Sequence, residues 1–279
     1  MFGKERSDLN NSERSLFGSV SFFAVGLMAY AFYLTASFSL VEFFLLASST
    51  LVTILVAGFR VLIPGTRIYV YSNIAIALWG GISLGPAGAI LLAAVAGITG
   101  RLRFGDRSSN SIYEICSDII AAFVGAIIYS LALTNFVSRL EMAGYEASLV
   151  PNEVIISAIL MAAAHFSVKA VLLFTKQSVS EARLPRRSSR EELSALLSSY
   201  PISILATILL FLVFKRFGMD FGLVIIPLVI AGNIAYKIHL RSLEVKTHEI
   251  MEASRLHLAT VEALATAIDA RDQVGTGHV

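Results

Sequence analysis

Long apolar segments alternate with short polar ones along most of this chain of 279 residues. An apolar run of about 18 residues or more is long enough to cross the hydrocarbon core of a bilayer as a helix. The pattern predicts eight such helices, at residues 16–36, 39–59, 67–84, 86–101, 112–134, 153–176, 195–215 and 219–239. We therefore expect an all-α, polytopic membrane protein with a polar tail at 1–15 and a membrane-embedded module over 16–239.

The third and fourth predicted helices are the least regular part of this pattern. Between them the chain reads Trp79-Gly80-Gly81-Ile82-Ser83-Leu84-Gly85-Pro86, which predicts a tight break, and the apolar run that follows is short. The two segments are compatible either with two separate spans or with a re-entrant pair. Gly81 and Gly85 also have the Gly-x-x-x-Gly spacing that favours close packing of membrane helices.

Composition and loop charge add an orientation to this picture. The chain is 56% hydrophobic and 15% charged, and its basic residues gather in a few short segments, so the net charge of +2 does not indicate nucleic-acid binding. Eight spans place these segments on one side of the membrane: Lys4, Arg6 and Arg14; Arg60 and Arg67; Arg101, Arg103 and Arg107; Lys176, Arg183, Arg186, Arg187 and Arg190; and Lys237, Arg241 and Lys246. The positive-inside rule then predicts a multi-pass membrane protein with both termini in the cytoplasm.

Ionisable side chains inside the predicted spans are candidates for function, because each is costly to insert into a bilayer. Glu114 and Asp118 lie four residues apart in the fifth span, and His165 and Lys169 have the same spacing in the sixth. Asp118 and Lys169 lie at matching depths, about 9 Å and 10 Å from the cytoplasmic ends of their helices. We therefore predict that Lys169 faces Asp118 or Glu114.

His165 falls near the midplane of the sixth span. It is a candidate proton-sensitive switch, ligand contact or metal ligand. The alternatives are structural: a hydrogen-bonded packing role for His165, and a Lys169 side chain that reaches the cytoplasmic interface. In the second span, Glu42 is a weaker candidate.

Residues 237–270 are predicted to leave the membrane as one long helix, with 240–258 as a linker. At heptad spacing, one row of the seam contains Leu240, Thr247, Ser254, Val261 and Ile268, and the other contains Leu243, Ile250, His257 and Leu264. The ends of this seam are apolar and its middle is polar, which favours a weak parallel homodimer. A monomeric amphipathic helix is the alternative.

The end of the chain carries the most specific motif. The run Thr260-Val261-Glu262-Ala263-Leu264-Ala265, then Ala267-Ile268-Asp269-Ala270-Arg271-Asp272, then Thr276-Gly277-His278, resembles the first helix and turn of HD-GYP domains. These domains are metal-dependent phosphohydrolases of the HD superfamily, and most act on cyclic di-GMP. The resemblance implies that residues 259–279 begin such a domain and that His278 is its first metal ligand.

The same resemblance implies a pair of divalent metal ions, Fe, Mn or Zn, in a longer parent protein. The other metal ligands and the Gly-Tyr-Pro signature would lie beyond Val279, so we expect this chain alone to bind no metal pair and to be inactive. Where some members have a glutamate for a third metal, this chain has Val274. The expected function is thus a membrane sensor that regulates a cyclic di-GMP phosphodiesterase, with lipid as a further partner.

Two other functions fit parts of the sequence. A transporter or permease with a cytoplasmic helical tail would use charged pairs and Gly-Pro breaks in its helices, although no inverted repeat is visible. A sensor histidine kinase would use His257 as phosphoacceptor, but the residues that follow, Leu258-Ala259-Thr260, lack the acidic residue and the proline usual for that chemistry.

Overall fold

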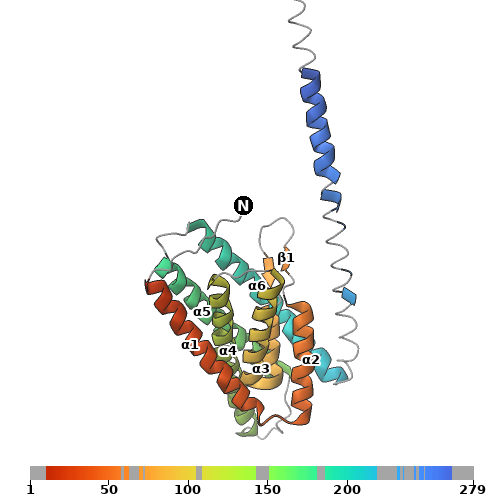
Figure 1. Cartoon of the computed structure of the whole chain (residues 1–279). Helices are drawn as coiled ribbons and strands as arrows, with labels where there is room; N and C mark the ends of the chain where they lie inside the picture. The colour runs from red at the N-terminus through yellow and green to blue at the C-terminus, as the bar shows by residue number, and fades with distance from the viewer. Residues whose placement is uncertain are drawn as a thin grey trace, which may run out of the picture. The chain divides into compact units, whose positions relative to one another are not determined.

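The computed structural model of the chain describes residues 11–57, 60–62, 69–71, 73–104, 109–142, 151–180, 186–218, 231–232, 235, 242, 245–247 and 249–265. Most of this part is helical (Figure 1). Its elements are α1 (Asn11–Thr35), α2 (Leu40–Val56), β1 (Arg60–Leu62), β2 (Tyr69–Tyr71), α3 (Asn73–Phe104), α4 (Ser109–Met142), α5 (Pro151–Ser180) and α6 (Arg186–Phe217). A further helical segment covers residues 249–265.

Five helices of the described part are long and apolar enough to cross a membrane: α1, α3, α4, α5 and α6. The apolar helix α2, at 17 residues, is shorter. The helical, membrane-like character predicted from the sequence is thus present, while the described residues confirm five spans and not the predicted eight. Most of the eighth predicted span, 219–239, lies outside the described residues.

The third and fourth predicted spans form a helix pair that reverses at one glycine. At Gly85 the backbone of α3 leaves the helical region, with φ 65° and ψ −157°, which only glycine adopts readily. A methyl group added to Gly80 would lie 2.6 Å from the carbonyl oxygen of Gly88. In a straight helix, residues eight apart are separated by about 12 Å. The two halves of α3 therefore fold back against each other, with Gly80 and Gly88 at their contact.

The start of the third predicted span needs a correction. Residues 69–71 form β2, which pairs antiparallel with β1 from Arg60↔Tyr71 to Leu62↔Tyr69, and the helix begins only at Asn73. The reason is local, because Tyr69-Val70-Tyr71 is a run of aromatic and β-branched residues, which favour strands. Apolarity alone does not distinguish such a run from the start of a membrane helix.

Residues 177–192 form a polar segment between the sixth and seventh predicted spans. The helices on either side of it are longer than their apolar runs. The helix α5 continues to Ser180 and α6 begins at Arg186, so most of that polar stretch is helical. The length of an apolar run indicates only the part of a helix that fits the hydrocarbon core of a bilayer. The helix itself can continue at either end through polar turns. At its other end α6 stops at Gly218, whose φ of 68° and N–H bond to the Phe214 carbonyl (2.8 Å) are typical of a helix C-cap.

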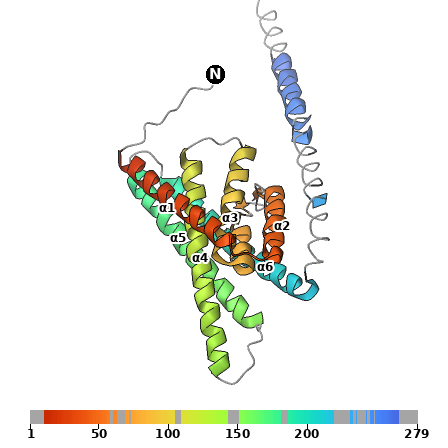
Figure 2. The ribbon, with the colours of Figure 1, turned by 60° about the horizontal axis from the view of Figure 1, so that its bottom comes forward.

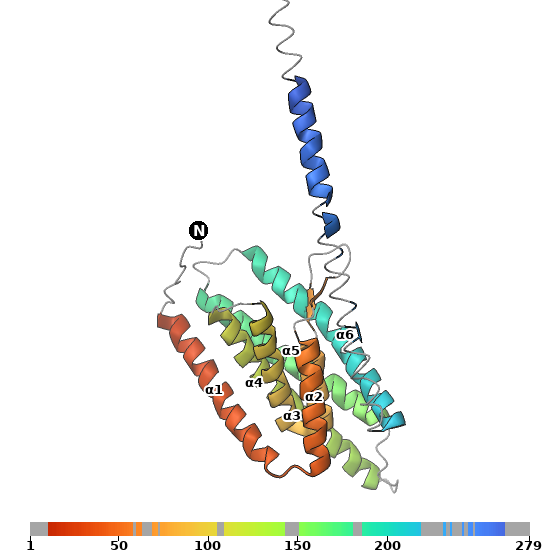
Figure 3. The same ribbon diagram turned by 45° about the vertical axis from the view of Figure 1, so that its right-hand side comes forward.

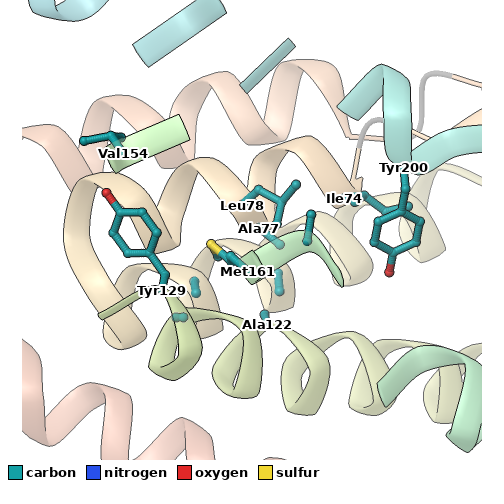
Figure 4. Packing of buried hydrophobic residues seen from close by; sticks show 12 residues of the cluster. Ile74, Ala77, Leu78, Ala122, Tyr129, Val154, Met161 and Tyr200 are labelled. Atoms are coloured by element: carbon teal, nitrogen blue, oxygen red, sulfur yellow. The ribbon is translucent and has the colours of Figure 1, made fainter. Parts of the chain in front are cut away.

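The halves of α3 lie at the centre of the bundle, and two groups of buried side chains pack against them. One group joins α3 to α4, α5 and α6 (Figure 4), and it contains Ile74, Ala77, Leu78, Ala89, Ala93, Ala122, Ala126, Tyr129, Val154, Met161, Ala162 and Tyr200. The second group joins α3 to α1 and α4. Many of these residues are alanine, which lets the helices approach closely, as in membrane bundles.

The helices α1 and α2 lie on the outside of the bundle, α1 against α3 and α4 and α2 against α3 (Figures 2 and 3). They expose large apolar side chains, among them Phe22, Tyr33 and Phe44 at 79%, 75% and 71%. Such a surface suits contact with lipid chains. Glu42 has a local role here, because Ser39 and Glu42 form a capping box at the start of α2, with the Ser39 N–H donating to Glu42 Oε2 at 2.7 Å.

The chain divides into two compact units, residues 1–226 and 227–279. In the second unit the segment 249–265 is helical. Its apolar residues Ile250, Leu256, Val261 and Leu264 are exposed. The seam residues Leu240, Leu243 and Ile268 lie outside the described part.

Candidate functional site

The helices α4 and α5 run antiparallel and carry the candidate site between them. Asp118 pairs with Lys169, while Gly125, two turns further along α4, contacts Met161, two turns earlier on α5. A methyl group added to Gly125 would lie 3.1 Å from the Met161 carbonyl oxygen. Residue numbers therefore rise on one helix as they fall on the other, and the backbones approach closely at the glycine.

Lys169 and Asp118 form the ion pair that the helical spacing predicts. Lys169 Nζ lies 2.6 Å from Asp118 Oδ1, and the two side chains are 14% and 20% exposed. Lys169 Nζ also donates to the Ser117 hydroxyl at 3.2 Å. The ammonium thus finds an anion and a neutral acceptor on α4, which offsets part of the cost of taking both charges out of water.

Glu114 contacts a different lysine, Lys176, at 4.0 Å between Nζ and Oε1. This second pair is weaker, because the Glu114 side chain is 66% exposed. Tyr113 links the same ends of the two helices: its hydroxyl donates to the Leu172 carbonyl at 2.8 Å, and Lys176 Nζ lies 5.6 Å from its ring centroid. Of the two carboxylates considered for Lys169, the structure therefore selects Asp118.

His165 is almost fully buried, at 1% exposure, one turn of α5 away from Lys169. Its Nδ1 lies 2.5 Å from the hydroxyl of Tyr200 on α6, and the two ring centroids are 5.7 Å apart. Phe166 packs edge-on against the same tyrosine at 5.2 Å between ring centroids. His165 is therefore held by α6, whereas Lys169 is held by α4, so α5 has polar contacts with both neighbours.

The contribution of α6 was missed by the sequence reasoning. Ser199, Ser203 and Thr207 follow at intervals of four residues, and their exposed fractions are only 1%, 3% and 2%. Thr207 Oγ1 contacts the Ala75 carbonyl of α3 at 3.3 Å. A polar residue every fourth position in an apolar span is a pattern visible in the sequence. This signal marks the inner face of α6, and Tyr200 stands beside it.

Metal-binding residues are not brought together in the part of the chain that the structure describes. No group of three or more His, Cys, Asp or Glu side chains there is arranged to hold a metal ion. His278, the metal ligand implied by the HD-GYP resemblance, lies outside the described residues. By the same resemblance, His278 alone does not supply the ligands for two metal ions.

No known protein family, no curated protein and no solved structure matches this chain. The geometry alone therefore defines the class: a helical membrane protein whose core contains a polar cluster of Asp118, Lys169, His165 and Tyr200. The likeness of residues 259–279 to HD-GYP domains rests on their own sequence.

Proposed function

We propose that this chain is the sensor part of a membrane-bound signalling protein of the bacterial inner membrane. The observation that carries the proposal is the Lys169–Asp118 ion pair, largely shielded from solvent between two apolar helices. Ionisable groups in a membrane bundle are costly and are retained where they bind or move. The pair joins α4 to α5, and the His165–Tyr200 contact joins α5 to α6, the last helix of the bundle among the described residues.

The output of the proposed sensor is an HD-GYP phosphohydrolase that hydrolyses cyclic di-GMP. The likeness of residues 259–279 to the start of such a domain supports this output, and a domain of this kind would continue past Val279. When bound, a divalent metal pair supplies the activated hydroxide for phosphodiester hydrolysis. His278 would be one of its ligands.

The helix between the two parts is the proposed transmitter and dimer contact. Its seam residues Ile250, Val261 and Leu264 are exposed, as a helix that pairs with a second copy of itself requires. Both termini are proposed to be cytoplasmic, since the basic loops then lie on one side of the membrane. The exposed aromatic face of α1 and α2 would contact lipid.

The first test is to read the gene past the codon for Val279. A continuing frame with a His-Asp doublet and a Gly-Tyr-Pro motif supports the proposal, and a frame without them contradicts the enzymatic output. The longer protein is then assayed in membranes for hydrolysis of cyclic di-GMP, with His278→Ala as the inactive control. An unchanged rate in this variant would remove His278 from the metal site.

A second candidate function, transport, is favoured by one observation. The helix pair of α3 reverses at Gly85 in the centre of the bundle, and broken helices at such positions line the substrate sites of many transporters. The two proposals differ in one measurable way. A transporter retains its activity when residues 240–279 are deleted, whereas a sensor loses its output with them.

A further inference from the structure

Three buried polar atoms on one side of α5 have no hydrogen-bond partner in the described part of the chain. They are Oε2 of Glu153, near the start of the helix, the hydroxyl oxygen of Ser157, whose residue is fully buried, and Nε2 of His165. Met161 lies midway between Ser157 and His165, four residues from each. A buried polar group without a partner costs about 1–3 kcal/mol, so each such atom in a native protein calls for a physical explanation.

The contact with Tyr200 determines which form of the His165 ring is favoured. The only partner that the described residues provide for the Tyr200 hydroxyl is His165 Nδ1. If the hydroxyl donates to Nδ1, the ring proton sits on Nε2, and only that N–H lacks a partner. If instead Nδ1–H donates, both the tyrosine O–H and the Nε2 lone pair lack partners. The first arrangement leaves fewer groups unsatisfied, so Nε2 of His165 is a donor.

The charges around His165 restrict what this donor binds. Asp118 of α4 and Lys169 of α5 are the charged groups near the ring, and they are paired with each other at 2.6 Å. From α6 it is faced by the neutral Tyr200. An ion bound here would be a buried charge without a counter-ion, which is unfavourable by several kcal/mol in order of magnitude. The acceptor that suits the site is therefore uncharged.

Met161 lies one turn before His165 on α5, and both residues lie near Gly125 of α4. The side chain of Met161 packs between α3 and α4: a methyl group on Gly81 would lie 2.2 Å from Met161 Cε, and one on Gly125 would lie 3.4 Å from both Met161 Cγ and His165 Cβ. Figure 4 shows Met161 in the middle of this core. Methionine is unbranched and flexible, so rotation of its side chain opens room for a small molecule between two glycines.

We propose that His165 Nε2–H is the donor of a binding site for a small uncharged molecule that accepts a hydrogen bond, and that Met161 yields to admit it. The shared chemistry is a neutral oxygen acceptor, supplied either by water or by a carbonyl compound that reaches the site through the membrane. Occupancy would act on α6 through the imidazole and Tyr200. This last step rests on the proposed signalling function, whereas binding itself does not.

The test uses the full chain in lipid bilayers with histidine labelled at both ring nitrogens and read by solid-state NMR. The His165 signals are assigned by their loss in His165→Gln. We expect the Nε2–H form. Butanone, a small neutral ketone, is expected to shift the Nε2 signal, while isopentane, of the same shape but without the oxygen, leaves it unchanged.

The sources of the acceptor are distinguished in the same samples. A magnetisation-transfer peak from water to Nε2–H identifies water as the occupant, and a shift with butanone alone identifies a site for carbonyl compounds. An Nδ1–H form, or an Nε2 signal with neither response, would overturn the proposal. None of these readouts involves cyclic di-GMP, so binding is tested separately from the signalling function.

Two tyrosine variants test the tautomer argument. Tyr200→Phe removes the donor to Nδ1 and is expected to give a mixture of both ring forms. Tyr129→Phe removes a hydroxyl from the other tyrosine of the same core group, which lies well apart from Tyr200 in Figure 4, and is expected to leave the His165 signals unchanged. Equal effects of the two variants would contradict the assignment.

Discussion

Lys169 and Asp118 show how a single pair of residues joins two helices that otherwise meet through small apolar side chains. The pair is largely shielded from solvent. Such a pair adds little to the free energy of unfolding, but removing one of its partners lowers that free energy strongly. A cation without its anion in this position is an uncompensated charge. The two residues therefore favour one relative position of α4 and α5.

The first prediction concerns this cost. Lys169→Met retains the length of the side chain but leaves Asp118 without its partner, so the free energy of unfolding should fall by about 3 kcal/mol. The double variant Lys169→Met with Asp118→Leu should recover most of that loss, since it removes both charges. Chemical unfolding in detergent micelles measures all three proteins.

Lys176→Met is the matched control, because Lys176 sits on the same helix and pairs at 4.0 Å with an exposed glutamate. Its effect should stay below about 1 kcal/mol. If both lysine variants lose the same stability, the Lys169–Asp118 pair has no special role. A double variant no more stable than Lys169→Met would point to lost packing instead.

Sequence reasoning reached this pair but not its neighbour. The spacing of four residues on two successive spans and the matching depths of the charged side chains were sufficient to place Lys169 opposite a carboxylate. The depths can be compared because every helical residue rises by the same amount from the cytoplasmic end of its span. Tyr200 was not foreseen, since a tyrosine in an apolar span is as readily assigned to the membrane interface. Only the packing of α5 against α6 brings it to His165.

At the scale of the element, α3 depends on its glycines in two different ways. Gly80 meets backbone: a methyl group there would lie 2.6 Å from the Gly88 carbonyl oxygen. Gly81 meets the end of a flexible side chain, Met161 Cε, at 2.2 Å. Backbone atoms of a packed helix cannot move aside without shifting the whole helix, whereas a methionine end rotates.

The second prediction follows from this contrast between neighbouring glycines. Gly80→Ala should lower the free energy of unfolding by about 2–3 kcal/mol or prevent folding, because it forces the halves of α3 apart. Gly81→Ala should cost less than about 1 kcal/mol, since alanine is the better helix former and Met161 can yield. Thermal unfolding monitored by size-exclusion chromatography ranks the two, and the reverse order would contradict the reversal of α3 at Gly85.

The third prediction concerns the end of α2. The Arg103 guanidinium of α3 donates to three carbonyls there, those of Ile54, Leu55 and Ala57, at 2.5, 3.1 and 2.8 Å. Lysine keeps the charge that favours a helix C-terminus but lacks the planar fork. Arg103→Lys should therefore reduce hydrogen-exchange protection of the last turn of α2, at a cost of about 1 kcal/mol. If Arg103→Met left the hydrogen-exchange protection of the last turn of α2 unchanged, the hydrogen bonds of Arg103 would not be needed to hold that turn.

Apolar length predicted that helices exist but not where each begins. The strand at Tyr69–Tyr71 follows from a local run of aromatic and β-branched residues, which apolarity does not distinguish from the start of a helix, whereas the reversal of α3 depends on contacts between its halves. The sequence predicted the break at Gly85-Pro86, and the contact of Gly80 with Gly88 shows that the chain folds back there, an arrangement that fits both a re-entrant pair and two antiparallel spans. Apolar length likewise gave the wrong start for the third predicted span.

At the scale of the whole molecule, polar contacts link the helices of the bundle two at a time. Asp118 joins α4 to α5, His165 joins α5 to α6, and Thr207 joins α6 to α3. Each is a discrete hydrogen-bonded contact in apolar surroundings, so it is either made or broken. A bundle of this kind suits two arrangements of α6, as the proposed sensor function requires.

The fourth prediction tests whether two copies of the chain meet along the helical segment 249–265. Cysteines are placed at Ser254, on the proposed seam, or at Glu252, on the far side of the same helix, in a background where the native Cys116 is replaced by serine. Both positions are exposed, so both thiols are accessible to an oxidant. In a parallel dimer the seam positions of the two copies lie directly opposite each other.

Ser254→Cys should therefore form a disulfide-linked dimer in membranes at least several-fold faster than Glu252→Cys, measured as the dimer band on non-reducing gels. Dilution with excess lipid separates a specific dimer from random collisions, because only the rate of random cross-linking falls in proportion to protein density. Equal rates at the two positions would favour the monomeric amphipathic helix.

The polar centre of the seam, with Ser254 and His257 between Ile250 and Val261, weakens the pairing and leaves it open to a shift in register or rotation. A change in the Ser254 cross-linking rate in Lys169→Met would then link the buried ion pair to the output helix.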